Sequence, residues 1–216
     1  MTADTVVLAT RNTAKLRELA RILGDQIRLT GLDSFPGAPD VPETGATFEQ
    51  NALLKARAVA AHTGLPAVAD DSGLCVDALN GMPGVLSARW AGVHGDDNAN
   101  LDLVLAQVAD VPDARLGARF VCGAALVVPD GAVREWVVTG QMAGRLIRGP
   151  RGSGGFGYDP IFLPDGFDLT TAEMTPEAKD AISHRGRAFR ALARFITVLA
   201  KGDDTPATPR SEACFD

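Results

Sequence analysis

Two adjacent carboxylates, Asp70 and Asp71, are the residues of this sequence best suited to hold a metal ion. They follow the apolar run 65–69, which we interpret as a buried strand, and Ser72-Gly73 comes next. Ligands of α/β sheets gather at the carboxyl ends of strands, where two carboxylates repel each other unless a cation compensates them. Mg²⁺ binds one or two carboxylates together with phosphate oxygens, although Asp-Asp-Ser-Gly also suits an ordinary turn. Glu43, in a proline-rich loop, is a candidate further ligand.

A phosphate site is indicated by residues 10–15, Thr-Arg-Asn-Thr-Ala-Lys. They connect a predicted strand to a predicted helix, whose N-terminus offers unpaired N–H groups and the positive end of its dipole. Thr10, Asn12 and Thr13 add short polar side chains, and Lys15 adds a positive charge. A capped helix with a solvated lysine is an equally good interpretation. The glycines of a P-loop are absent from this segment.

The glycine-rich segment 149–157 and the residues that follow it suit a flat, polar ligand. Glycine lets the backbone approach a ligand closely. Phe156 and Tyr158 could stack on a base, and Asp159 could accept hydrogen bonds from base N–H groups. The alternative is a flexible loop whose aromatic side chains pack on the core.

Alternating strands and helices position these residues, as in an α/β protein. Thr47 and Gln50 have capping-box spacing, and Pro129-Asp130-Gly131 predicts a hairpin between two β-rich runs. Lys179 and the pair His184-Arg185 lie near the starts of helices, where they are either ligands or solvated side chains. The predicted strands span 5–10, 65–69, 119–128, 132–139 and 140–147, and the predicted helices span 14–23, 47–62, 98–108 and 186–201.

Composition limits the classes of partner. The 216 residues include 21 Lys and Arg and 27 Asp and Glu, for a net charge of −6, which disfavours general nucleic-acid binding. No apolar run approaches the roughly 20 residues that span a bilayer, and the N-terminus lacks the pattern of a signal peptide. The three cysteines have no zinc spacing. We therefore expect a cytoplasmic protein that binds neither membrane nor nucleic acid.

Several blocks of the sequence together resemble the inosine triphosphate pyrophosphatases, which act on ITP, dITP and XTP. The blocks occur in the family's order and cover about residues 5–200. They are Leu8–Lys15, Glu43–Phe48 with Asn51-Ala52 and Lys55–Arg57, Ala69–Leu74, Pro83–Val85 with Ser87–Arg89, Gly154–Phe162, and Ile182–Gly186.

The resemblance implies a role for each matching residue. Asp71 is similar in place to the family's metal ligand and general base, and Asp70 and Glu43 would support a Mg²⁺ site. Arg11 departs from the small residue frequent at its position, so its side chain either reaches phosphate or points to solvent. The implied triphosphate ligands are Thr10, Arg11, Asn12, Thr13, Ala14, Lys15 and Lys55, and the implied nucleotide-pocket residues are Ser72, Phe156, Gly157, Tyr158, Asp159, Lys179, His184 and Arg185.

The resemblance also implies a fold and an assembly. The fold is a single α/β unit of two lobes around a long, twisted mixed β-sheet flanked by helices, with the active cleft between the lobes. Family members are usually homodimers. We expect residues 1–202 to form the pyrophosphatase domain and residues 203–216, which are polar and lack periodicity, to form a disordered tail.

The expected activity is Mg²⁺-dependent hydrolysis of non-standard purine triphosphates to the monophosphate and pyrophosphate. Asp71 would orient the attacking water or accept its proton, and Lys15 and Lys55 would stabilise the departing pyrophosphate. Donors from His184, Arg185 or backbone N–H groups would favour a base with a 6-oxygen. The alternatives are a related pyrophosphatase for modified pyrimidine nucleotides and a nucleotide sensor without turnover. The retained acids argue against the sensor.

Overall fold

A computed structural model describes residues 5–24, 27–129 and 133–200. The predicted tail, 203–216, and the turn residues Asp130 and Gly131 lie outside the described residues. Among the described helices, none is long and apolar enough to cross a lipid bilayer.

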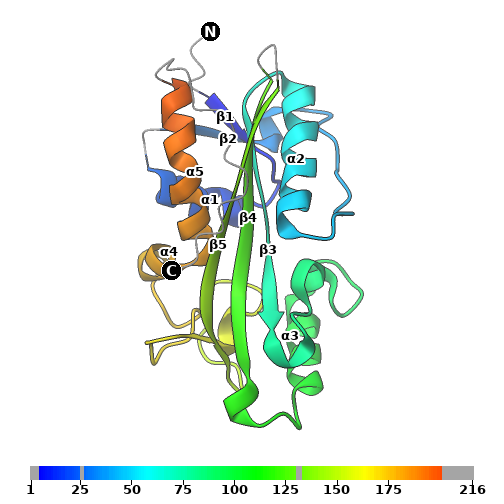
Figure 1. The fold of residues 1–216 in the computed structure, drawn as a ribbon, viewed down its shortest axis with the longest axis vertical. Coiled ribbons are helices and arrows are strands. Elements are labelled where there is room, and N and C mark those ends of the chain that lie inside the picture. Colours follow the sequence, from blue (N-terminus) through cyan, green and yellow to red (C-terminus); the bar gives the residue numbers. More distant parts are fainter. Residues whose placement is uncertain (1–4, 25–26, 130–132, 201–216) are drawn as a thin grey trace. The chain divides into compact units, whose positions relative to one another are not determined.

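The described chain forms a six-stranded mixed sheet with the strand order β2-β1-β3-β4-β5-β6 (Figure 1). Strand β1 pairs in parallel with both β2 and β3, and β5 pairs antiparallel with β6. The strands are β1 (Thr5–Leu8), β2 (Arg28–Gly31), β3 (Ala67–Val76), β4 (Gly117–Val128), β5 (Arg134–Leu146) and β6 (Phe162–Pro164), and the helices are α1 (Thr13–Leu23), α2 (Phe48–Thr63), α3 (Asp97–Gln107), α4 (Pro176–Ile182) and α5 (His184–Ala200).

The chain divides into two compact units. Unit 1 contains the described residues of Met1–Asp71, Cys122–Gly140 and Arg185–Asp216, and unit 2 contains Ser72–Val121 and Gln141–His184. Strands β3, β4 and β5 each contribute residues to both units. The α/β class and the long mixed sheet flanked by helices, predicted from the sequence, are confirmed.

Unit 1 has an apolar core on each face of its part of the sheet. Leu19 of α1 and Phe189 and Leu192 of α5 pack with alternate residues of β1, β3 and β4 on one face. Ala56 and Val59 of α2 pack with the intervening strand residues on the other face. Because side chains alternate across a strand, helices on both faces require strands that are apolar throughout. This arrangement places α2 opposite α1 and α5 (Figure 1).

Unit 2 has one apolar cluster. Helix α3 contributes Leu101 and Val104, which pack with residues of β3, β4 and β5. Tyr158 belongs to the same cluster and is 4% exposed. The helix begins where Asp96 accepts a hydrogen bond from the N–H of Ala99 and so caps the N-terminus.

The predicted end of the strand before Asp70-Asp71 was wrong. Strand β3 continues through both aspartates and ends at Val76. Ser72-Gly73 favours a turn in isolation, but Leu74 and Val76 are apolar and pack in the core of unit 2, which extends the strand. The two aspartates therefore lie inside a strand and their side chains must alternate.

Three smaller differences concern the extent of one strand, the start of one helix and the presence of one short strand. The runs 132–139 and 140–147 form one strand, β5, and α5 begins at His184 rather than at 186. Strand β2, of four residues, was not predicted, because its sequence Arg-Leu-Thr-Gly has little apolar character and the strand is recognised only by its pairing with β1.

We predict that Gly123→Ala destabilises the protein by about 1–3 kcal/mol, the usual cost of overpacking a close contact. A Cβ at Gly123 of β4 would lie 2.6 Å from the backbone N of Glu49 and 2.7 Å from the carbonyl carbon of Phe48, in the first turn of α2. Gly149→Ala is the control, because a Cβ there meets no atom within 4 Å. Urea unfolding of the two variants measures the difference, and equal stability would contradict the close packing of α2 on β4.

Candidate active site

The turn between β1 and α1 is organised by its own side chains. The N–H of Asn12 donates to Thr10 Oγ1 at 3.1 Å, and Asn12 Oδ1 accepts from the N–H of Lys15 at 3.2 Å. Asn12 thus caps α1. The Lys15 ammonium extends from the first turn to Asp70, with Nζ at 3.2 and 3.4 Å from the two carboxylate oxygens.

The exposed Arg11 has a protein partner that the sequence did not suggest. Its guanidinium Nη2 donates to the backbone carbonyl of Ala38 at 2.8 Å, in the loop after β2. The side chain therefore links this loop to the β1–α1 turn. Its predicted contact with phosphate stays a prediction, as does that of Thr13 and Ala14 beside it.

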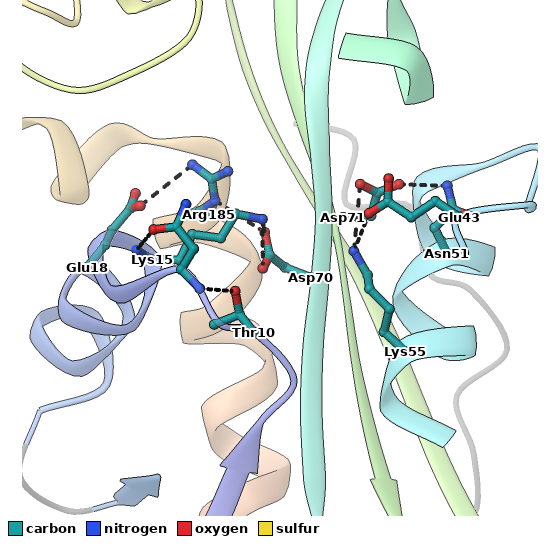
Figure 2. A network of polar contacts seen from close by, with 10 residues as sticks. Thr10, Lys15, Glu18, Glu43, Asn51, Lys55, Asp70, Asp71 and Arg185 are labelled. Atoms are coloured by element: carbon teal, nitrogen blue, oxygen red, sulfur yellow. Dashed lines mark hydrogen bonds and ion pairs between the residues drawn. The ribbon is translucent and has the colours of Figure 1, made fainter. Parts of the chain in front are cut away.

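Asp70 and Asp71 point to opposite faces of β3, as Figure 2 shows. Adjacent residues of a strand alternate in direction, so each carboxylate has its own set of partners. Asp70 faces Lys15 and Arg185, whereas Asp71 faces Asn51 and Lys55. The repulsion between neighbouring carboxylates that the sequence suggests is relieved by this separation.

Cations surround the buried carboxylate of Asp70. Arg185, in the first turn of α5, donates from Nε to Asp70 Oδ2 at 3.2 Å, and its Nη1 lies 3.6 Å from Glu18 Oε2 of α1 (Figure 2). Burial alone raises the pKa of Asp70, but Lys15, Arg185 and Lys55 outweigh it and hold the pKa far below its usual range. Asp70 is therefore ionised and binds two basic side chains that come from different helices.

The face of β3 that carries Asp71 has a different charge balance. Asp71 Oδ2 accepts from Asn51 Nδ2 at 2.8 Å, and its Oδ1 lies 3.9 Å from Lys55 Nζ. Lys55 also donates to Glu43 Oε1 at 2.7 Å. Burial and the charges of Glu43 and Asp70 raise the pKa of Asp71 to about 6, against the opposing effects of Lys55 and Asn51.

A divalent cation fits the pair of Asp71 and Glu43 better than the predicted set of three acids. Both carboxylates contact one ammonium group, so two negative charges share one positive charge in a mostly buried position. Mg²⁺ is bound by one or two carboxylates, which matches this pair. Within the described ranges no three His, Cys, Asp or Glu side chains gather around one position. Asp70 differs from its predicted place because the strand turns it to the other face.

In unit 2, Asp159 organises the end of the glycine-rich segment. One carboxylate oxygen accepts from Thr171 Oγ1 at 2.8 Å, and the other accepts from the N–H of Phe156 at 2.9 Å and from Lys179 Nζ at 2.5 Å. The Lys179 ammonium also lies 5.4 Å from the centre of the Phe156 ring. Both oxygens of Asp159 thus have protein donors, whereas the sequence suggested that they accept from a base.

Two aromatic candidates are buried within unit 2. The Tyr158 hydroxyl donates to the carbonyl of Ser87 at 2.8 Å, and its ring packs in the apolar cluster. The expectation that Tyr158 stacks on a base does not fit this burial, so stacking is left to Phe156. The His184 ring stacks on Phe120 with 4.9 Å between ring centres. The half-buried Gly157, by contrast, donates from its N–H to Asp97 Oδ2 at 2.8 Å.

Comparison with known proteins identifies the family. A family model described as the Ham1 family matches residues 6–195. The chain belongs to the Ham1 family. The match includes all of the predicted site residues, and it confirms the relationship that the sequence motifs indicated.

Relatives of high identity extend over almost the whole chain. A protein of Nocardia farcinica named dITP/XTP pyrophosphatase is 61% identical over 204 residues, which are 93% of this chain and 98% of the relative. Among solved structures, the nucleoside-triphosphatase / dITP/XTP pyrophosphatase of Mycobacterium abscessus is 58% identical with a TM-score of 0.72, and the match covers 87% of this chain and 98% of that one. The HAM1 protein of Coxiella burnetii is 43% identical with a TM-score of 0.80 and coverages of 89% and 98%.

Besides Asp97, polar residues of this Ham1 chain that were not among the candidates contact the predicted site residues. Asn51 contacts Asp71, Glu18 contacts Arg185, and Thr171 contacts Asp159. Asn51 could have been identified from the sequence, because it lies four residues before Lys55 and so shares its face of a helix. Glu18 and Thr171 could not have been identified in this way, since their partners Arg185 and Asp159 are distant in sequence.

We predict that Asp159→Asn lowers the free energy of unfolding by about 3–5 kcal/mol, because it leaves the buried Lys179 ammonium without its counter-charge. The double variant Asp159→Asn with Lys179→Met should regain part of that loss. Asp165→Ala, an exposed acid, is the control. Urea unfolding of the wild type, these three variants and the Lys179→Met single variant measures the losses, and a loss in the double variant equal to the sum of the two single losses would contradict the pairing.

Proposed function

We propose that this chain hydrolyses non-standard purine nucleoside triphosphates, namely ITP, dITP and XTP, to the monophosphate and pyrophosphate. The observation that carries the proposal is the buried Asp71 held beside Glu43, Lys55 and Asn51 in a member of the Ham1 family. High identity to proteins named dITP/XTP pyrophosphatase supports the choice of substrate. Removing such triphosphates would cleanse the nucleotide pool.

The electrostatics of unit 1 support binding of an anion beside Asp70. Helices α1 and α5 both lack an acidic residue in the first turn, where acids are normally favoured. Each instead carries a basic residue there that contacts Asp70, Lys15 in α1 and Arg185 in α5. Positive charge and the positive ends of two helix dipoles therefore meet at this carboxylate. The backbone N–H groups after Thr10 would donate to phosphate oxygens at this end of α1.

Asp71 is assigned to the attack on the α phosphate. Its Oδ2 is fixed by Asn51, so the carboxylate can orient a water molecule or accept its proton without turning. Lys55 lies next to this carboxylate, and we assign it with Lys15 to the charge on the departing pyrophosphate. A sensor that bound phosphate without a metal ion would have no use for this pair of acids.

Asp71 and Glu43 are the residues that would hold Mg²⁺. When bound, the ion would offset phosphate charge and polarise the phosphoryl oxygens. Asp70 is assigned to Lys15 and Arg185 instead, since it binds both of them directly.

Recognition of the base is assigned to residues of the glycine-rich segment and of helices α4 and α5. Phe156 would stack on the base, and His184 or Arg185 would donate to the 6-oxygen that hypoxanthine and xanthine carry. Lys179 would stabilise the Phe156 ring, which it contacts. The homodimeric state and the cytoplasmic location rest on the family resemblance and belong to the same proposal.

The test is hydrolysis in ¹⁸O-labelled water with Mg²⁺ and a panel of ITP, dITP, XTP, ATP, GTP and dUTP. We expect pyrophosphate and a labelled monophosphate, with kcat/KM for ITP above that for ATP by at least about 100-fold, since polar contacts to a base discriminate strongly. EDTA should stop the reaction and added Mg²⁺ should restore it. Label in orthophosphate, preference for dUTP, or binding without turnover would each overturn the proposal.

A further inference from the structure

Asn51 is a polar residue buried in an apolar environment. It lies in the first turns of α2 and is 0% exposed, among the alanine and valine residues that pack this helix on the sheet. Its amide makes two hydrogen bonds, accepting from the N–H of Gly45 at 2.7 Å and donating to Asp71 Oδ2 at 2.8 Å. A buried amide of this kind needs partners on both sides, and here the two partners are parts of the proposed catalytic apparatus.

These two bonds determine which way the amide faces. The backbone N–H of Gly45 can only donate, so the oxygen of Asn51 must face Gly45 and its NH₂ group must face Asp71. The donated hydrogen bond then fixes the plane of the Asp71 carboxylate. The other oxygen of that carboxylate is directed towards Lys55, four residues along the same helix (Figure 2).

The same amide also sets the position of the loop that carries Glu43. Gly45 lies two residues after Glu43 and approaches Asn51 so closely that a Cβ at Gly45 would be 2.7 Å from Asn51 Oδ1. Glycine is therefore required there by close approach. One side chain thus contacts Asp71 directly and the Glu43 loop through its backbone.

Gln50 provides an internal comparison. Its Oε1 accepts from the N–H of Ala46 at 2.7 Å, so it holds the same loop through the next amide. Gln50 is exposed and has no contact with Asp71. The two neighbouring amides therefore share the task of holding the loop, and only Asn51 adds a contact to the carboxylate.

We propose that Asn51 is a positioning residue for the hydrolysis, acting through the hydrogen bond that it donates to Asp71. This inference rests on the proposed function, because it assigns Asn51 a role in that reaction. Asn51 sets the orientation of Asp71 relative to Glu43, and Lys55 of the same helix offsets part of the charge of the two carboxylates. Displacing a reacting group by about 1 Å can cost about 100-fold in rate, so the fixed amide has a measurable effect on kcat.

The experiment separates the contact with Asp71 from the contact with the loop. Asn51→Asp keeps the shape and the acceptor for the Gly45 N–H but replaces the donor towards Asp71 by an oxygen. Gln50→Ala removes a loop contact and keeps the donor. Asn51→Ala removes both contacts of Asn51 and serves if the aspartate variant does not fold. Each protein is assayed with ITP and Mg²⁺ well above the usual pKa range of carboxylates, and the hydrogen exchange of the Gly45 amide is measured by NMR without ligand.

We expect Asn51→Asp and Asn51→Ala to lose about 100-fold in kcat with KM within about threefold of wild type. The Gly45 amide should stay protected in Asn51→Asp and lose protection in Asn51→Ala. Gln50→Ala should keep kcat within about threefold of wild type.

The proposal is overturned if Asn51→Asp keeps wild-type kcat, or if Gln50→Ala loses as much as Asn51→Ala, which would make loop anchoring the cause. Failure of the proposed function has a different signature, because the wild-type protein itself would then release no pyrophosphate from ITP. An active wild type with an active Asn51→Asp overturns the role of Asn51 alone.

Discussion

The alternation of side chains along β3 is the constraint on which the site depends. It places Asp70 and Asp71, adjacent in sequence, on opposite faces of a sheet that is covered on both sides in unit 1. Each carboxylate is buried and needs its own compensation. Helices α1 and α5 supply Lys15 and Arg185 to one, and α2 supplies Asn51 and Lys55 to the other.

The ion pairs around Asp70 are better explained by the positions they give to Lys15 and Arg185 than by a contribution to the stability of the fold. Taking carboxylates and cations out of water costs free energy that their attraction often only offsets, so a buried ion pair is weak evidence for stability. In this chain the network holds basic side chains in the first turns of two helices, where the dipoles disfavour them. Lys15 and Arg185 are thereby kept in positions suited to an anionic ligand, at the carboxylate that connects the two helices.

Local sequence predicted the elements more readily than their bounds. The strand–turn–helix opening and the Thr47 cap of α2 follow from short-range chemistry and are present in the structure. The course of β3 was missed because Asp-Asp-Ser-Gly favours a turn locally. Tertiary burial of Leu74 and Val76 in unit 2 prevails over that preference.

The candidate residues could be named from the motifs, but their partners could not. Lys15 and Asp70 are 55 residues apart, and Arg185 and Asp70 are 115 apart, so no local pattern reveals these contacts. The alternative in which aromatic side chains of this segment pack on the core describes Tyr158, but the three protein donors on Asp159 could not be predicted, since they depend on how unit 2 packs. Asn51 is the exception, because its spacing from Lys55 already placed both on one face of a helix.

The central claim is that the two aspartates of β3 have separate tasks, with the chemistry at Asp71. The most direct measurement is kcat for ITP hydrolysis by purified Asp71→Asn, with urea unfolding of the same sample as the check on its fold. The account predicts a loss of at least about 1,000-fold in kcat, as expected when a reacting group is removed, with stability at least equal to wild type because a buried like charge beside Glu43 is gone. Activity within about threefold of wild type, equivalent to less than about 1 kcal/mol of transition-state stabilisation, would contradict it.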